Sequence, residues 1–155
     1  IFTKSNSDVE GRKINKLIDQ YVYENPKNSI SITSLGQIRY LSALKYVDAI
    51  VGNSSSGLLE APSLKIGTIN IGGRQDGRIK ASSVIDCLPN KQNLIKAFKK
   101  LYSSEFQSAL KSVDNPYGNE NASYKIVKIL KTIKLENILK KSFYDIEYEL
   151  WKFYL

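Results

Sequence analysis

The sequence contains no histidine among its 155 residues and only one cysteine, Cys87. Without histidine the chain cannot form a Ser/His or Cys/His nucleophilic device or a His-ligated zinc site. One cysteine cannot form an internal disulfide bond or a multi-cysteine metal site. We therefore expect neither a metal ion nor another cofactor.

Long apolar runs are also absent. No stretch approaches the roughly 20 residues that a membrane span needs, so we expect no membrane partner. Residues 1–4 lack the methionine, the basic segment and the apolar segment of a signal peptide, and they are typical of a strand entered from upstream. A cytoplasmic protein is the resulting expectation.

Positive charge is in excess. The net charge is +8, and the segment between Lys91 and Lys141 holds eleven lysines and four acidic residues. Such an excess favours a nucleic acid or an acidic surface as a partner. The lysines, however, lie opposite apolar stripes of predicted helices, without the interleaved aromatic residues of single-strand binders. We expect no nucleic acid, and a basic nucleic-acid-binding module stays as an alternative.

Short β-branched segments alternate with amphipathic ones along the chain. This alternation predicts an α/β fold with a doubly wound parallel sheet. The predicted strands are residues 1–4, 29–33, 48–52, 68–71 and 83–86. Apolar spacing predicts helices around residues 14–22, 34–44, 58–64, 90–102 and 126–133, with a similar period continuing to the end. Asp8 and Asn90 are the expected N-caps, Ile38 is expected on the apolar face of its helix, and Pro62 is expected to strain the third helix.

A serine-rich turn, residues 52–57, stands between the third strand and a helix. A strand, a turn of small residues and a helix place free backbone N–H groups and three hydroxyls at one point, where a phosphate fits. The alternative is that Asn53 and the serines only form a turn and an N-cap. These six residues alone leave both interpretations open.

Three polar loops are predicted at the carboxyl ends of strands, where ligands bind in parallel α/β sheets. They are residues 5–8, 53–57 and 72–78, the last a glycine-rich loop with two arginines. The connection rules place all three on one rim of the sheet. This convergence favours a binding site.

An ordered set of motifs resembles one known family. Residues 48–62, DAIVGNSSSGLLEAP, are followed by TINIG at 68–72 and by RQ-x-GR at 74–78, and FTKSNSD at 2–8 also matches. This succession resembles the C-terminal domain of the hydrolysing UDP-N-acetylglucosamine 2-epimerases, enzymes of sialic acid and related nonulosonic acid synthesis. The resemblance implies the Rossmann-like C-terminal half of a GT-B fold, without its N-terminal domain. It covers residues 1–133, expected to be the UDP-binding domain, and leaves 134–155 as an amphipathic helical tail.

The resemblance also implies the roles of single residues. Ser54 and Ser55 would donate to the diphosphate, together with Ser56 and Gly57 of the same turn. Glu60 would accept hydrogen bonds from the ribose hydroxyls. The remaining assignments are Arg74 for the diphosphate, Arg78 as a weaker candidate that could pair with Asp76, and Asn6 and Asp8 facing the sugar.

The resemblance has departures. The family turn of residues 115–122 is NPYGNENA here and lacks an acid and a glycine, so we interpret it as a turn leading into a helix. The family's acidic catalytic groups and histidine lie outside this chain, so no catalytic residue is assigned. We expect the UDP-binding domain of an enzyme that converts UDP-N-acetylglucosamine to N-acetylmannosamine and UDP. The alternative enzyme class is a GT-B glycosyltransferase. The expected partners are the UDP-sugar, the N-terminal domain and a second copy of the chain.

In the family's strand order the first strand is central, and we expect it to be absent from this chain. Buried strand edges are rarely left unpaired. Three arrangements remain, and we favour the first two. The strand at residue 1 pairs directly with the strand at residue 48, a second copy covers the edges, or the missing strand exists upstream.

Overall fold

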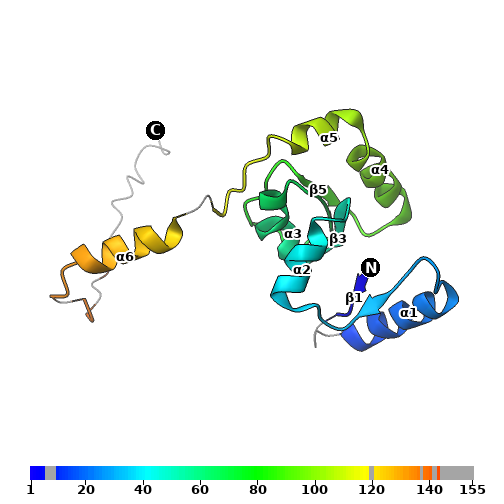
Figure 1. The fold of residues 1–155 in the computed structure, drawn as a ribbon, viewed down its shortest axis with the longest axis horizontal. Coiled ribbons are helices and arrows are strands. Elements are labelled where there is room, and N and C mark those ends of the chain that lie inside the picture. Colours follow the sequence, from blue (N-terminus) through cyan, green and yellow to red (C-terminus); the bar gives the residue numbers. More distant parts are fainter. Residues whose placement is uncertain (6–9, 119–120, 137, 141–142, 144–155) are drawn as a thin grey trace, which may run out of the picture. The chain divides into compact units, whose positions relative to one another are not determined.

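The computed structural model describes residues 1–5, 10–118, 121–136, 138–140 and 143 (Figure 1). The chain divides into two compact units, residues 1–117 and residues 118–155. The expected boundary between residues 133 and 134 lies inside the second unit. In the described part of the chain, every strand belongs to the first unit.

The strands of the first unit form two parallel sheets. The first sheet pairs β1 (Phe2–Thr3) with β2 (Ser31–Ile32). The second has the order β3 (Ala49–Gly52), β4 (Gly67–Ile71), β5 (Val84–Cys87). In this sheet Ile50 lies opposite Thr68, and Thr68 lies opposite Val84. The α/β class with parallel strands is confirmed, and its pattern is that of a Rossmann-like fragment.

Helices connect the strands and follow them. Those of the first unit are α1 (Gly11–Glu24), α2 (Gly36–Leu44), α3 (Ser56–Leu59), the 3-10 helix η1 (Ala61–Leu64), α4 (Lys91–Leu101) and α5 (Ser104–Leu110). The sequence analysis missed α5, because seven residues are too few to show a clear period. Its start has a local signal, since the Ser103 hydroxyl accepts a hydrogen bond from the Phe106 N–H at 3.2 Å.

The structure confirms one of the two predicted N-caps, does not describe the other, and divides one predicted helix. Asn90 is the N-cap of α4, with its Oδ1 atom 2.9 Å from the Asn93 nitrogen, as predicted. Asp8 lies outside the described residues, and Glu10 occupies the N-cap position of α1 with a φ of 72°. The helix predicted over residues 58–64 is divided, because Pro62 has no N–H to continue an α-helix, so α3 ends at Leu59 and a 3-10 turn follows.

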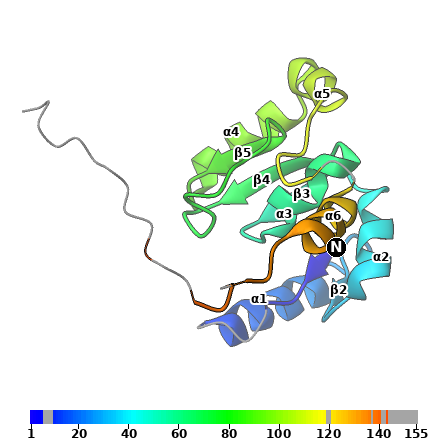
Figure 2. The same cartoon turned by 90° about the vertical axis from the view of Figure 1, so that its left-hand side faces the viewer.

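Two apolar clusters cover the two faces of the second sheet. On one face α4 and α5 pack on β4 and β5, and Figure 2 shows α4 along that sheet. On the other face α2 and η1 pack on β3. The first cluster contains Ile69, Ile85, Cys87, Leu101, Phe106, Leu110 and Val113, and the second contains Leu44, Ala61 and Ile66. Ile38 was expected to be buried with Leu44, but 83% of it is exposed, so that part of the prediction is wrong.

The second unit contains α6 (Ala122–Thr132), in which no residue is buried. Residues 134–136 and 138–140 contain no helix, and most of the expected helical tail lies outside the described residues. Of the predicted turn before α6, residues 119–120 lie outside the described part of the chain. Its first residues belong to the first unit, where Asn115 donates to the Leu59 carbonyl at 2.8 Å and the Tyr117 hydroxyl donates to the Ile79 carbonyl at 2.9 Å. No helix among the described residues is long and apolar enough to cross a membrane.

The two sheets do not join. β1 pairs with β2 and β3 pairs with β4, and within the described residues β1 and β3 are not neighbours. The favoured prediction of direct pairing between these strands is therefore wrong. Their facing edges border a cleft instead.

Gly67 permits the close packing of β4 against the α4–α5 layer. A Cβ atom at this position would lie 2.4 Å from Leu101 Cδ1 and 3.2 Å from Phe106 Cε1. Leu101 is fully buried, so it has no free space into which to move.

We expect Gly67→Ala to lower the free energy of unfolding by about 1–3 kcal/mol, the usual cost of overpacking a core. Urea unfolding of the purified chain measures this change. Gly118→Ala is the matched control, because a Cβ there meets no atom within 4 Å. Equal stability of the two variants would contradict the packing role of Gly67.

Candidate functional site

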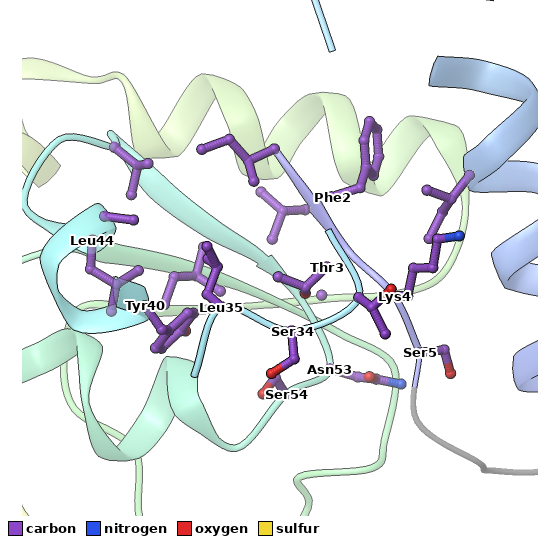
Figure 3. A pocket seen from close by; sticks show the side chains of 18 of the residues that line it. Phe2, Thr3, Lys4, Ser5, Ser34, Leu35, Tyr40, Leu44, Asn53 and Ser54 are labelled. Carbon is purple, nitrogen blue, oxygen red and sulfur yellow. The ribbon is translucent and has the colours of Figure 1, made fainter. Parts of the chain in front are cut away.

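A cleft of about 850 Å³ lies between the two sheets of the first unit. Its sides come from β1, β3, α1 and α2, and its lining includes residues 1–5 and 49–54. In Figure 3 the polar groups of Ser5, Asn53 and Ser54 gather along the lower side, whereas Phe2 lies at the upper side. The cleft therefore has a polar end at the carboxyl ends of the strands and a more apolar body between them.

Three loops meet at the polar end, as the sequence predicted. Lys4 and Ser5 follow β1, Asn53 and Ser54 follow β3, and Arg74 comes from the loop after β4. Two cationic side chains, hydroxyls and an amide thus line one end of the cleft, and one of the two cations, Lys4, is paired with Asp19 of α1 at 2.7 Å. This set of donors suits a phosphate or diphosphate. Asn6 and Asp8 lie outside the described residues, so their expected contact with a sugar stays a prediction.

The serine turn is held by short-range hydrogen bonds. The Ser54 hydroxyl accepts from the Ser56 N–H at 3.3 Å, and the Ser56 hydroxyl is hydrogen bonded to the Tyr40 hydroxyl of α2. Ser55 is the N-cap of α3 without a side-chain cap bond. Because α3 has only four residues, its dipole is weak, so any attraction of an anion to this turn would come mainly from the hydroxyls and the nearby cations.

Tyr40 is a site residue that the sequence analysis missed. It lines the cleft, and burial raises the pKa of its hydroxyl. The hydrogen bond to Ser56 acts in the opposite direction, and the carboxylate of Glu60 raises the pKa further. Tyr40 is therefore a neutral hydroxyl beside the serine turn at physiological pH. A tyrosine within an amphipathic helix gives no sequence signal for such a role.

Gln75 joins two of the three loops. Only 3% of this residue is exposed, and its Nε2 atom donates to the backbone carbonyl of Asn53 at 2.7 Å. Its Oε1 atom is buried and has no partner among the described residues. The loop after β4 is thereby bonded to the serine turn, in a contact that the sequence analysis did not foresee.

Gly57 has a packing position in the structure. It is buried, and a Cβ atom there would lie 2.5 Å from Thr68 Cγ2. The Thr68 hydroxyl donates to the Gly57 carbonyl at 2.9 Å, which holds α3 against β4. Glycine at this position lets the turn approach the sheet closely, and the expected contact of Gly57 with UDP remains a prediction.

Glu60 and Arg78 lie apart from the lining of the cleft. Glu60 is half-buried at the end of α3, close enough to Tyr40 to act on its pKa. Arg78 is exposed. The carboxylate of Asp76 lies 3.8 Å from Lys80 Nζ, and no ion pair between Asp76 and Arg78 occurs among the described residues. The structure therefore gives no support to the expected pairing of Arg78 with Asp76.

A polar network connects the ends of β4 and β5. Asn70 and Lys80 both donate to Asp86, at 2.7 and 2.8 Å. Partial burial would raise the pKa of the Asp86 carboxyl, but these hydrogen bonds and the Lys80 charge outweigh it and hold the pKa below its ordinary value. Asp86 is therefore a carboxylate at neutral pH. Within the described residues no group of three acidic or cysteine side chains could hold a metal ion.

Comparison with known proteins identifies the family. The sequence model of the UDP-N-acetylglucosamine 2-epimerase family matches residues 1–131. The chain belongs to this family. The resemblance seen in the serine turn and the loops after β1 and β4 is thereby confirmed.

Several curated proteins are similar to the chain over most of its length. It is 43% identical over 147 residues to a GDP/UDP-N,N'-diacetylbacillosamine 2-epimerase (hydrolyzing) of Campylobacter jejuni. It is 42% identical over 151 residues to polysialic acid biosynthesis protein P7 of Escherichia coli. Both alignments cover 94% of this chain and 38% and 37% of the two relatives. A UDP-N,N'-diacetylbacillosamine 2-epimerase (hydrolyzing) of Legionella pneumophila is 31% identical over 142 residues, or 36% of its length. The chain thus spans little more than a third of the relatives it matches.

We expect Gln75→Leu to lower the free energy of unfolding by about 0.5–1.5 kcal/mol, because it removes the hydrogen bond from the buried Gln75 side chain to the Asn53 carbonyl. Urea unfolding measures the loss. Gln92→Leu is the matched control, since Gln92 is exposed on α4. A Gln75 variant as stable as the control would show that the hydrogen bond between the loops contributes nothing.

Proposed function

We propose that this chain is the UDP-binding part of a hydrolysing UDP-N-acetylglucosamine 2-epimerase. The supporting observation is the convergence of Lys4, Ser54 and Arg74 at one end of the cleft. Arg74 and Lys4 supply positive charge and Ser54 supplies a hydroxyl, which suits a diphosphate, and Lys4 Nζ also lies 2.7 Å from Asp19 Oδ1. Family membership makes UDP the nucleotide to test first.

The proposed contacts follow the placement of each residue. The Arg74 guanidinium and Lys4 ammonium neutralise the diphosphate, and the hydroxyls of Ser54 and Ser55 donate to it. Glu60 accepts from the ribose hydroxyls when the nucleoside lies along α3, on the side of Tyr40. Ser56 contributes through its bond to Tyr40, and Gly57 lets the turn lie close to β4.

The proposed reaction takes place on the sugar of the bound substrate. A base removes the C2 proton, the C1–O bond to UDP breaks with its electrons going to the UDP oxygen, and a 2-acetamidoglucal remains. Water then adds across the double bond, with the proton at C2 on the opposite face, and N-acetylmannosamine is released. The residues of this chain stabilise the negative charge of the departing UDP. The base and the acid come from the rest of the full-length enzyme, in a second domain of a GT-B fold.

A glycosyltransferase with a similar nucleotide site would use the same contacts. The two reactions differ in the acceptor, which is water in the epimerase and a second sugar or another hydroxyl compound in the transferase. Incubation of the full-length protein with UDP-N-acetylglucosamine and no acceptor separates them. Release of UDP together with N-acetylmannosamine supports the proposal, and intact substrate excludes the epimerase reaction on this sugar.

We expect Arg74→Ala and Glu60→Ala to weaken UDP binding to the full-length enzyme by roughly ten- to hundredfold each, because each loses a charge-assisted hydrogen bond. The two effects should add in free energy, since the residues contact different ends of the nucleotide. Titration calorimetry measures the affinities. Lys96→Ala, which removes a cation from the exposed side of α4, is the control and should leave UDP affinity unchanged. Unaltered affinity in both site variants would show that UDP binds elsewhere.

We also expect the 155-residue chain alone to have no epimerase activity, because the base and the acid that the reaction needs are not assigned to any of its residues. The measurement is chromatographic detection of N-acetylmannosamine after incubation of the purified chain with UDP-N-acetylglucosamine. The full-length enzyme is the positive control. Turnover by the chain alone would place the catalytic groups within these 155 residues.

A further inference from the structure

The loop after β4, residues 72–80, carries Arg74 to the polar end of the cleft. Two of its glycines have positive φ, Gly72 at 74° and Gly77 at 77°, so its backbone takes conformations that other residues rarely adopt. Glycine also gives a loop more conformational freedom, which must be removed before Arg74 can hold a ligand. Contacts made by the side chains of this loop therefore bear on how firmly Arg74 is held.

Lys80, at the far end of this loop, is fixed to the second sheet. Its Nζ atom donates to both carboxylate oxygens of Asp86 in β5, at 2.8 and 2.9 Å. Asp86 also accepts from Nδ2 of Asn70 in β4 at 2.7 Å, and Asn70 is buried. The backbone beside Lys80 is held as well, because the Tyr117 hydroxyl donates to the Ile79 carbonyl. The Lys80 ammonium is therefore a fixed positive charge beside the ends of β4 and β5.

The same ammonium group also contacts the turn that contains Arg74. Lys80 Nζ lies 3.8 Å from Oδ1 of Asp76. The Asp76 N–H donates to the Gly73 carbonyl at 3.0 Å, and a Cβ atom at Gly73 would lie only 2.7 Å from Asp76 Oδ2. Residues 73–76 thus form a closed turn, with the Asp76 carboxylate folded over its first residue. Lys80 attracts that carboxylate toward β5.

Lys80 contributes to the site without lining it. Within the part of the chain that the structure describes, Arg74 is the residue of this loop that lines the cleft. Two carboxylates, those of Asp76 and Asp86, already surround the Lys80 ammonium, and 22% of its side chain is exposed. A cation neutralised in this way has little charge left for a phosphate. Any effect of Lys80 on a ligand must therefore pass through the turn.

We propose that Lys80 is a positioning residue for the nucleotide diphosphate. By bridging Asp86 and Asp76, it holds the turn in the conformation that keeps Arg74 at the polar end of the cleft. This role rests on the proposed function, in which Arg74 neutralises the diphosphate. The ligand then meets a guanidinium group that is already in place, and less of the binding free energy is lost in ordering the loop.

The turn is held from two sides. On the side of the cleft, Gln75 Nε2 donates to the Asn53 carbonyl at 2.7 Å. On the side of β5, Lys80 holds the turn from its bond to Asp86. The contact of Gln75 is a neutral hydrogen bond from a buried side chain, whereas that of Lys80 depends on charge. Loss of the Lys80 charge would leave the turn bonded to Asn53 but free to move away from β5, so the expected effect on UDP binding is partial.

A double-mutant cycle tests this role, with the UDP affinity of the full-length enzyme measured by titration calorimetry. We expect Lys80→Ala to weaken UDP binding roughly three- to tenfold, in keeping with the loss of a partly exposed ion pair. Lys80→Arg should bind UDP within about twofold of the parent, because a guanidinium group also pairs with carboxylates. In the Arg74→Ala background, Lys80→Ala should change the affinity by less than about twofold, since Lys80 acts through Arg74. Lys96→Ala, which removes an exposed lysine from α4, is the control and should bind UDP normally.

The outcomes separate this role from the proposed function. If Arg74→Ala weakens UDP binding and Lys80→Ala does not, UDP binds as proposed and Lys80 has no positioning role. If the two losses add in the double variant, Lys80 acts independently of Arg74 and the role is overturned. A Lys80→Arg variant as weak as Lys80→Ala would overturn it too, because the positive charge would not be what holds the turn. If Arg74→Ala has no effect, the proposed UDP site is wrong and the role of Lys80 falls with it.

Amide hydrogen exchange of the full-length enzyme measures the turn itself. We expect the Asp76 amide, which is bonded to the Gly73 carbonyl, to exchange about fivefold faster or more in Lys80→Ala than in the parent. The Thr68 amide, which donates to the Ser83 carbonyl at 2.9 Å, is the internal control and should exchange at the same rate in both. Unchanged exchange of Asp76 would show that Lys80 does not hold the turn. Equal acceleration of both amides would show that Lys80 stabilises the whole sheet, which also contradicts a positioning role.

Discussion

The first unit depends on the pairing of β4 with a strand on each side. β4 is hydrogen bonded to β3 and β5, and four of its five residues are buried. Ile69 faces the α4–α5 layer, whereas Thr68 faces Gly57 and holds the serine turn. The loop that follows β4 supplies both Arg74 and Gln75. β4 therefore contributes to the core along its length and leads into the candidate site at its carboxyl end. A substitution that displaces β4 would disturb the packing of the core and the position of the site loop together.

The sequence predicted those parts of the fold that depend on residues close together in the chain. The alternation of strands and helices, the Asn90 cap and the three polar loops all appear in the structure, because each depends on residues close together in the chain. The division of the third helix was only partly foreseen. Pro62 gave the signal for strain, but the 3-10 geometry that follows depends on how η1 packs on β3.

The errors come from interactions between distant residues. Whether β1 meets β3 depends on what occupies the space between them, and no local pattern encodes that. Ile38 fits the apolar period of α2, yet it is exposed because the cluster under that helix is centred on Leu44. Tyr40 and Gln75 were missed for the same reason, since their roles arise from contacts with residues 16 and 22 positions away. The meeting of the three loops at one end of the cleft could be predicted from the sequence, but the bonds between them could not.

The bond between Gln75 and the Asn53 carbonyl has a mechanical consequence. A loop at the mouth of a cleft normally opens and closes by itself, at the cost of a few solvent-exposed contacts. Here neither the serine turn nor the loop after β4 can move away from the other without breaking a hydrogen bond whose donor side chain is buried. This bond couples the two loops, so a ligand that holds one loop in place also restrains the other.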